Sequence, residues 1–100
     1  MAWRRVPVSE LPKGMREAFA ETDAMYARVA GLRFREERLF TDADDGVWPL
    51  ITISVIMRDE GINIDVTRKL NRGAFFSKCN LPIQLVNELI DMIRSAANAN

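Results

Sequence analysis

The residues of this chain that could take part in chemistry are few, and they do not form a catalytic set. The 100-residue sequence contains no histidine. This excludes serine–histidine and cysteine–histidine nucleophile pairs, and also histidine-ligated metals. The single cysteine, Cys79, follows Lys78 in "SKCNL", where it is either a thiolate activated by the lysine or a small residue at a strand end. Each glycine stands alone, so there is no phosphate-binding loop. We therefore expect no enzymatic activity.

The stretch "FTDADDGVWPL" is the densest group of potential metal ligands. A calcium loop places acids at its first, third and fifth positions, glycine at the sixth and glutamate at the twelfth. Counted from Asp42, Asp44 fits, but Asp45 and Gly46 come one position early and the twelfth residue is Ile53. We therefore expect no metal and no cofactor. A solvated turn and a loop that binds a partner remain as alternatives.

Charge is balanced in total but uneven along the chain. Fourteen basic residues face fourteen acidic ones, so the basic excess that is usual in nucleic-acid-binding proteins is missing. Acids dominate from residue 36 to residue 60, and bases dominate from residue 67 to residue 78. The acidic candidates for partner binding, with a neighbouring aromatic, are Asp42, Asp44, Asp45, Trp48, Asp59 and Glu60. The alternative, nucleic-acid-binding candidates are Arg68, Lys69, Arg72 and Lys78. Glu36 and Glu37 are interpreted as solvated charge.

Hydrophobic periodicity indicates the elements that must position these residues. Apolar residues at helical spacing predict one helix within residues 9–32 and another within residues 81–97. Alternation predicts strands at residues 47–57 and 62–70, joined by the turn "RDEG". The segments "RFREERLF" and "AFFSKCNL" are weaker candidates for a first and a fourth strand.

The fold class predicted from this order is α+β. Specifically, a four-stranded antiparallel sheet is covered on one face by both helices in a two-layer sandwich, in the order α-β-β-β-β-α. Residues 1–100 are expected to form one domain, with an N-terminal arm at residues 1–8 and a frayed tail at residues 98–100. The predicted core contains Phe19, Ile53, Val55, Ile64, Val66, Leu89 and Ile93. No apolar run is long enough to span a bilayer, and the lone cysteine suits a reducing cytoplasm.

A small chain with acidic turns, such as "TDADDG" and "RDEG", resembles the anti-CRISPR proteins of phages and mobile elements, including those that act on type I-F surveillance complexes. The resemblance implies a non-catalytic inhibitor in the host cytoplasm. Such an inhibitor docks on the basic, nucleic-acid-handling surface of a nucleoprotein complex and blocks binding of the target nucleic acid. Exposed aromatics, namely Trp3, Tyr26 and Trp48, are expected to anchor the contact.

A different class is suggested by residues 62–93, which resemble the PC4-type coactivator plan, a curved four-stranded sheet followed by a dimerising helix. This resemblance implies a single-stranded nucleic-acid-binding protein. The basic residues would follow the backbone and Phe75 or Phe76 would stack on bases, the other phenylalanine being core. Either reading leaves open a homodimer through the stripe of the second helix.

Overall fold

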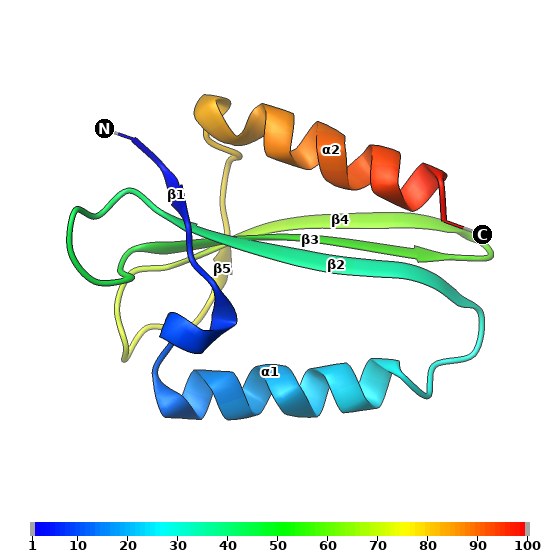
Figure 1. Ribbon diagram of the computed structural model, residues 1–100, viewed down its shortest axis with the longest axis horizontal. Coiled ribbons are helices and arrows are strands. Elements are labelled where there is room, and N and C mark those ends of the chain that lie inside the picture. Colours follow the sequence, from blue (N-terminus) through cyan, green and yellow to red (C-terminus); the bar gives the residue numbers. More distant parts are fainter. Residues whose placement is uncertain (1, 100) are drawn as a thin grey trace.

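The computed structural model describes residues 2–99. Within them, an N-terminal strand and two helices accompany a set of strands in simple chain order (Figure 1). The strands are β1 (Arg4–Arg5), β2 (Leu32–Thr41), β3 (Leu50–Arg58), β4 (Gly61–Lys69) and β5 (Ser77–Lys78). The helices are α1 (Lys13–Tyr26) and α2 (Val86–Ala97), preceded by the short 3-10 turns η1 (Val8–Glu10) and η2 (Ile83–Leu85).

The strands form one antiparallel meander in the order β1-β2-β3-β4-β5. The α+β class and the antiparallel sheet are therefore confirmed, but the described sheet has five strands and not four. The additional strand is β1, which pairs Arg4 with Thr41 and Arg5 with Phe40. Arg4 and Arg5 of the predicted N-terminal arm are thus part of the sheet.

The last strand is much shorter than the sequence suggested. Of "AFFSKCNL", only Ser77 and Lys78 pair with β4, opposite Arg68 and Thr67. The expectation that either Phe75 or Phe76 is core is wrong, because Phe75 is 94% exposed and Phe76 is 40% exposed. The segment before β5 is a loop, so successive side chains there do not point to opposite faces of a sheet.

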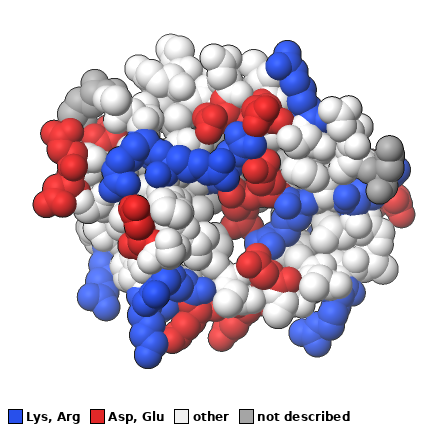
Figure 2. Space-filling view, viewed as in Figure 1, with Lys and Arg blue, Asp and Glu red and all other residues white. Residues whose placement is uncertain are grey.

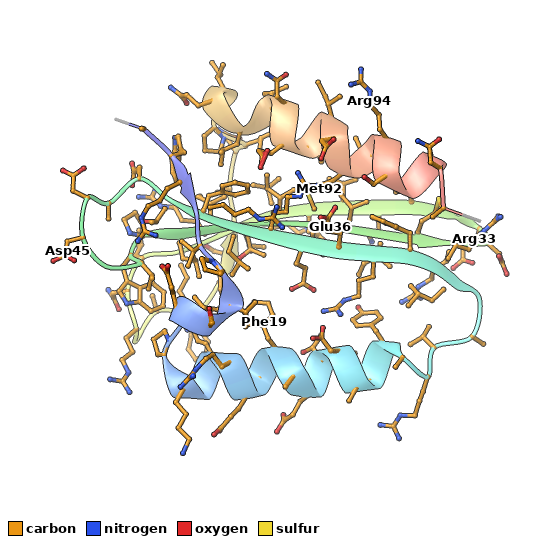
Figure 3. The ribbon with its side chains drawn as sticks, viewed as in Figure 1. Phe19, Arg33, Glu36, Asp45, Met92 and Arg94 are labelled. Atoms are coloured by element: carbon orange, nitrogen blue, oxygen red, sulfur yellow. The ribbon has the colours of Figure 1, made fainter. Side chains whose placement is uncertain are left out.

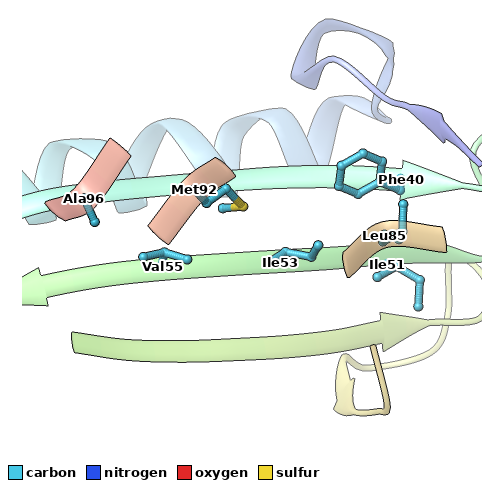
Figure 4. Close-up of a cluster of buried hydrophobic side chains, with 7 residues drawn as sticks. All are labelled: Phe40, Ile51, Ile53, Val55, Leu85, Met92 and Ala96. Carbon is cyan, nitrogen blue, oxygen red and sulfur yellow. The ribbon is translucent and has the colours of Figure 1, made fainter. Parts of the chain in front are cut away.

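The two helices lie on opposite faces of the sheet, which corrects the predicted two-layer sandwich to three layers (Figure 1). The α2 face carries Phe40, Ile51, Ile53 and Val55, which are buried against Leu85, Met92 and Ala96 (Figure 4). On the other face, α1 packs Met15 and Phe19 against a second cluster, formed by Val6, Leu11, Leu39 and Leu50. A single sheet can bury both faces only where each carries apolar residues, and Leu39 and Leu50 supply these on the α1 face.

The predicted single core is divided accordingly. Ile53 and Val55 are fully buried, and Val66 and Leu89 pack on the same cluster. Phe19 belongs to the other face, and Ile64 is 39% exposed. Ile93 is only partly buried.

The C-terminal turn of α2 continues further than expected. The Asn98 N–H donates to the Arg94 carbonyl oxygen and the Ala99 N–H to the Ala96 carbonyl oxygen. The rest of the predicted tail, Asn100, and Met1 of the predicted arm lie outside the described residues. In residues 2–99, neither helix has the length and apolar character required to cross a bilayer.

Candidate functional site

The acidic loop, residues 42–49, connects β2 to β3 at one end of the sheet. It is held at its base by the Ala43 N–H, which donates to the Thr41 hydroxyl over 3.2 Å. Arg4 of β1 donates to the carbonyl oxygen of Gly46 and also contacts Glu10. Gly46 has φ of +78°, a conformation that favours glycine at the tip. Asp44 and Asp45 are exposed there, and acidic side chains gather at this edge of the molecule (Figures 2 and 3).

Most carboxylates of the protein are already paired with a cation, but those of the turns are not. Eight described carboxylates lie within 4.0 Å of a lysine or arginine. Among residues 2–99, the ones without such a partner are Glu21, Asp42, Asp44, Asp45, Asp59 and Glu60. All except Glu21 belong to the predicted partner-binding set. The free negative charge of the described chain is therefore concentrated in the two hairpin turns.

The two turns do not form one surface. Asp59 and Glu60 make the β3–β4 turn, next to the closing pair Arg58 and Gly61. The acidic loop makes the β2–β3 connection at the other end of the same strands (Figure 1). The structure therefore brings Asp42, Asp44 and Asp45 together with Trp48 but leaves the second turn apart.

The three aromatics expected to be exposed anchors are all partly buried. Trp3 packs on the α2-face cluster, Trp48 packs on the α1-face cluster, and the Arg35 guanidinium lies 4.6 Å from the centre of the Tyr26 ring. The exposed aromatics of the described chain are Phe75 and, to a lesser extent, Phe76. Sequence alternation was a poor guide here because Phe75 lies in a loop.

The basic segment, residues 68–78, lies at the same end as the acidic loop. Lys69 stands between two aromatic rings, with its Nζ 5.8 Å from the Trp48 centroid and 5.4 Å from that of Phe76. Lys78 lies 3.5 Å from Asp65. In the described chain, Arg68 and Arg72 have no carboxylate within 4.0 Å. Half of the predicted nucleic-acid-binding set is thus engaged within the molecule.

A hollow of about 470 Å³ separates α1 from the sheet beside this basic segment. Its apolar wall comes from α1, through Met15, Ala18 and Phe19, and its polar rim includes Lys69 and Arg72. No residue of α1 is fully buried, so the helix covers the sheet loosely. The hollow gives this end of the molecule a recess beside its charged loops.

Sequence reasoning missed a cluster of charges between α2 and the sheet. Arg38 Nε donates to Glu36 over 2.9 Å, and its Nη2 donates to Asp91 of α2 over 2.7 Å. Glu88 lies 3.6 Å away. Burial lowers the pKa of the Arg38 guanidinium, but the hydrogen bonds with Glu36 and Asp91 raise that pKa further, so the net direction is upward. Glu36 is thus a structural partner, which corrects its interpretation as solvated charge.

Glu37 and Arg35 form a corresponding group on the α1 face. Arg35 donates to Glu37 and to Asp23 of α1, so Glu37 is also paired and not free. Glu36 and Glu37 point to opposite faces, as strand alternation predicts. The signal in the sequence was the run Arg35-Glu36-Glu37-Arg38, in which each arginine stands two residues from an acid on the same face of the strand.

Cys79 is not set up as a nucleophile. Burial raises the pKa of its thiol, and the nearby charge of Arg68 lowers that pKa by less. The thiol packs at the margin of the α2-face cluster. The alternative of a small residue beside a strand end therefore describes Cys79 better than an activated thiolate does.

Residues 2–99 contain no group of three or more cysteine, aspartate or glutamate side chains close enough to hold a metal ion. Comparison of the chain with known protein families, curated proteins and solved structures found no match.

Proposed function

We propose that this chain is a non-catalytic protein-binding inhibitor that docks on a basic, nucleic-acid-handling surface. The observation that carries the proposal is the set of unpartnered carboxylates at Asp42, Asp44 and Asp45. Such a surface displays arginines and lysines to bind phosphate. Carboxylates can occupy the same positions, and arginine–carboxylate pairs are often bidentate. In the form implied by the anti-CRISPR resemblance, the contact blocks binding of the target nucleic acid.

The acidic loop is a better candidate for the binding surface than the basic segment, because more of its charged side chains have no partner within the described chain. Lys69 is engaged with aromatic rings and Lys78 with Asp65, whereas the three aspartates have no described partner. The contact of Arg4 with Gly46 fixes the loop on the sheet, which reduces the entropy that ordering it on binding would cost. Apolar groups at the same end of the sheet, namely exposed Phe75 and the recess lined by Phe19, support a contact that combines charge with hydrophobic burial.

The test compares the parent chain with the triple variant Asp42→Asn, Asp44→Asn, Asp45→Asn. Each is immobilised and exposed to purified bacterial nucleoprotein complexes, and binding is measured at several salt concentrations. We expect the parent to bind, and the triple variant to associate more slowly and at least about tenfold more weakly, since rim charges act on association and desolvated pairs on dissociation.

Glu21→Gln is the matched control, because Glu21 is the unpartnered described carboxylate outside the turns. It should bind like the parent. Equal affinity, equal association rate and equal salt dependence for the parent and the triple variant would refute the proposal.

A second candidate function is single-stranded nucleic-acid binding, favoured by one observation. Phe75 is 94% exposed and lies three residues from Arg72 in the same loop, and Arg72 has no described carboxylate partner. An exposed ring and a free cation in one loop suit base stacking and a phosphate contact. Titration with a labelled single-stranded oligonucleotide distinguishes the two functions. Affinity that falls steeply with salt and is lost in the double variant Phe75→Ala, Arg72→Gln would support this candidate over the first.

A further inference from the structure

The outer edge of β4 is open over most of its length. β5 pairs with β4 only at Thr67 and Arg68, and Cys79 adds one hydrogen bond at Val66, so residues 61–65 have no strand neighbour on that side in the described chain. The opposite edge of the sheet ends in β1, which is short and carries exposed Arg4 and Arg5. Short length and charge are the usual protections of an edge strand. The open part of β4, "GINID", has neither lysine nor proline, and its one charged side chain, Asp65, is paired with Lys78.

The direction of the free backbone groups follows from one hydrogen bond. The Val66 carbonyl oxygen accepts from the Cys79 N–H over 3.1 Å, so it points toward the outer edge. The register of β4 with β3 runs without interruption, and backbone groups alternate along a strand. The N–H and C=O groups of Ile64 and Ile62 therefore also point outward, and those of Asn63 point toward β3.

The same residues present an apolar surface on the α2 face. Ile62 and Ile64 are 46% and 39% exposed, because α2 packs over β2 and β3. The side of α2 that carries Glu88 and Asp91 faces Arg38 of β2. Helical spacing puts Val86, Leu89, Ile90 and Ile93 on the other side of the helix, toward β4. Leu89 and Val66 of β4 pack against the same cluster.

We propose that a second copy of this chain covers this edge, with β4 pairing antiparallel to β4 about a two-fold axis at Asn63. In this register, Ile62 of one copy lies opposite Ile64 of the other. The outward N–H and C=O groups of both isoleucines then find partners, and their side chains meet on the α2 face. A register centred on Ile64 is poorer, because it requires the Val66 carbonyl that Cys79 already uses.

Charge complementarity supports the same register. It places Gly61 opposite Asp65 of the other copy and brings the turn residue Glu60 up to Cys79, which occupies the position beside Val66 and follows Lys78 at the end of β5. Asp59 and Glu60 have no described partner, and Lys78, which lies 3.5 Å from Asp65 of its own copy, keeps an exposed side chain. The acidic turn of each copy therefore approaches a lysine of the other. Isologous pairing of this kind closes on itself.

This inference does not depend on the proposed function. The acidic loop lies at the other end of the strands (Figure 1), so it stays free in each copy. The β3–β4 turn, which the proposed function leaves outside the contact, takes part in self-association.

Sedimentation equilibrium measures the proposed dimer directly. The parent chain should sediment as a dimer at about 100 µM. Ile64→Lys should raise the dimer dissociation constant by about tenfold or more, because it places a charge at the centre of the apolar contact. Ile83→Lys is the matched control, since Ile83 is an exposed isoleucine in η2, outside the pairing segment, and it should leave the dimer intact. Circular dichroism checks that each variant is folded.

Cross-linking tests the register. In a Cys79→Ser background, Asn63→Cys places two thiols opposite each other at a non-hydrogen-bonded pair, where Cα atoms are about 4.5 Å apart. This variant should form an intermolecular disulfide on mild oxidation. Asp65→Cys should not, because residue 65 faces Gly61 of the other copy.

A parent chain that remains monomeric at about 100 µM would overturn the proposal. A dimer unaffected by Ile64→Lys, or cross-linked equally through residues 63 and 65, would also overturn it. A monomer that instead binds an extended peptide at this edge, in a way that Ile64→Lys abolishes, would assign the edge to a strand from a different protein.

Discussion

Among the charged residues, Arg38 contributes most to the docking of α2 on the sheet. Its side chain is 10% exposed, and it links β2 to Asp91 and Glu88 of the helix. Removing a nearly buried cation leaves its carboxylate partners without compensation. These partners retain some contact with solvent, which moderates the cost.

We expect Arg38→Ala to lower the free energy of unfolding by about 1–3 kcal/mol. Urea denaturation followed by circular dichroism measures this. Arg94→Ala is the control, because Arg94 is on the same helix and points away from the sheet (Figure 3). Equal stabilities for the two variants would show that the Arg38 cluster contributes nothing to docking.

The role of Arg38 could not be predicted from the sequence. Strand alternation correctly separated Glu36 from Glu37, but it carries no information about which helix covers which face. The partners in α2 are fifty or more residues away along the chain. The prediction that Trp48 is exposed was wrong for the same reason, because residues from other elements cover its ring.

Only part of the apolar stripe of α2 is buried. Met92 and Ala96 are fully buried, whereas Leu89 is partly buried and Ile90 is exposed. Figure 4 shows Met92 above the sheet, in the same cluster as Val55 and Ile53.

We expect Met92→Ala to lower the free energy of unfolding by about 2–5 kcal/mol, the range for truncating a fully buried large side chain. Leu89→Ala should cost clearly less, because part of that side chain already contacts solvent. Thermal or urea unfolding of the two variants decides the order. The reverse order would mean that the helix is rotated from the orientation described.

α1 is held far less firmly than α2. It has no fully buried residue, and its contact with the sheet is made chiefly by Met15 and Phe19. We expect its amide hydrogens to exchange with solvent faster than those of β2 and β3, because few buried contacts oppose local opening. Hydrogen–deuterium exchange with mass spectrometry measures this, and equal protection of α1 and β3 would contradict it.

The sequence predicted the two helices, β3 and β4 well, because the helical period and the two-residue strand period are strong in those segments. It could not assign the helices to faces. Both are amphipathic, and the apolar residues that attract α1 come from separate places, Val6, Leu11, Leu39 and Leu50. β1 was not predicted, because a strand of two residues is too short to show an alternation of apolar and polar side chains.

At the scale of the whole molecule, the structure has consequences for metal ions. The acidic loop lacks calcium-loop spacing, and residues 2–99 hold no cluster of metal-ligating side chains. Millimolar calcium or magnesium should therefore leave the melting temperature unchanged, because a ligand stabilises a protein only when it binds the folded state. Differential scanning fluorimetry with and without each ion tests this, and a rise of several degrees would contradict it.

The position of α2 in chain order affects how the protein is made. The ribosome completes β2, β3 and β4 before it synthesises Leu85, Met92 and Ala96, which cover their apolar face. Until α2 has left the exit tunnel, the nascent chain exposes Ile51, Ile53 and Val55 together with the open edge of β4. During that interval the chain is prone to aggregation and is a suitable client for chaperones that bind apolar segments.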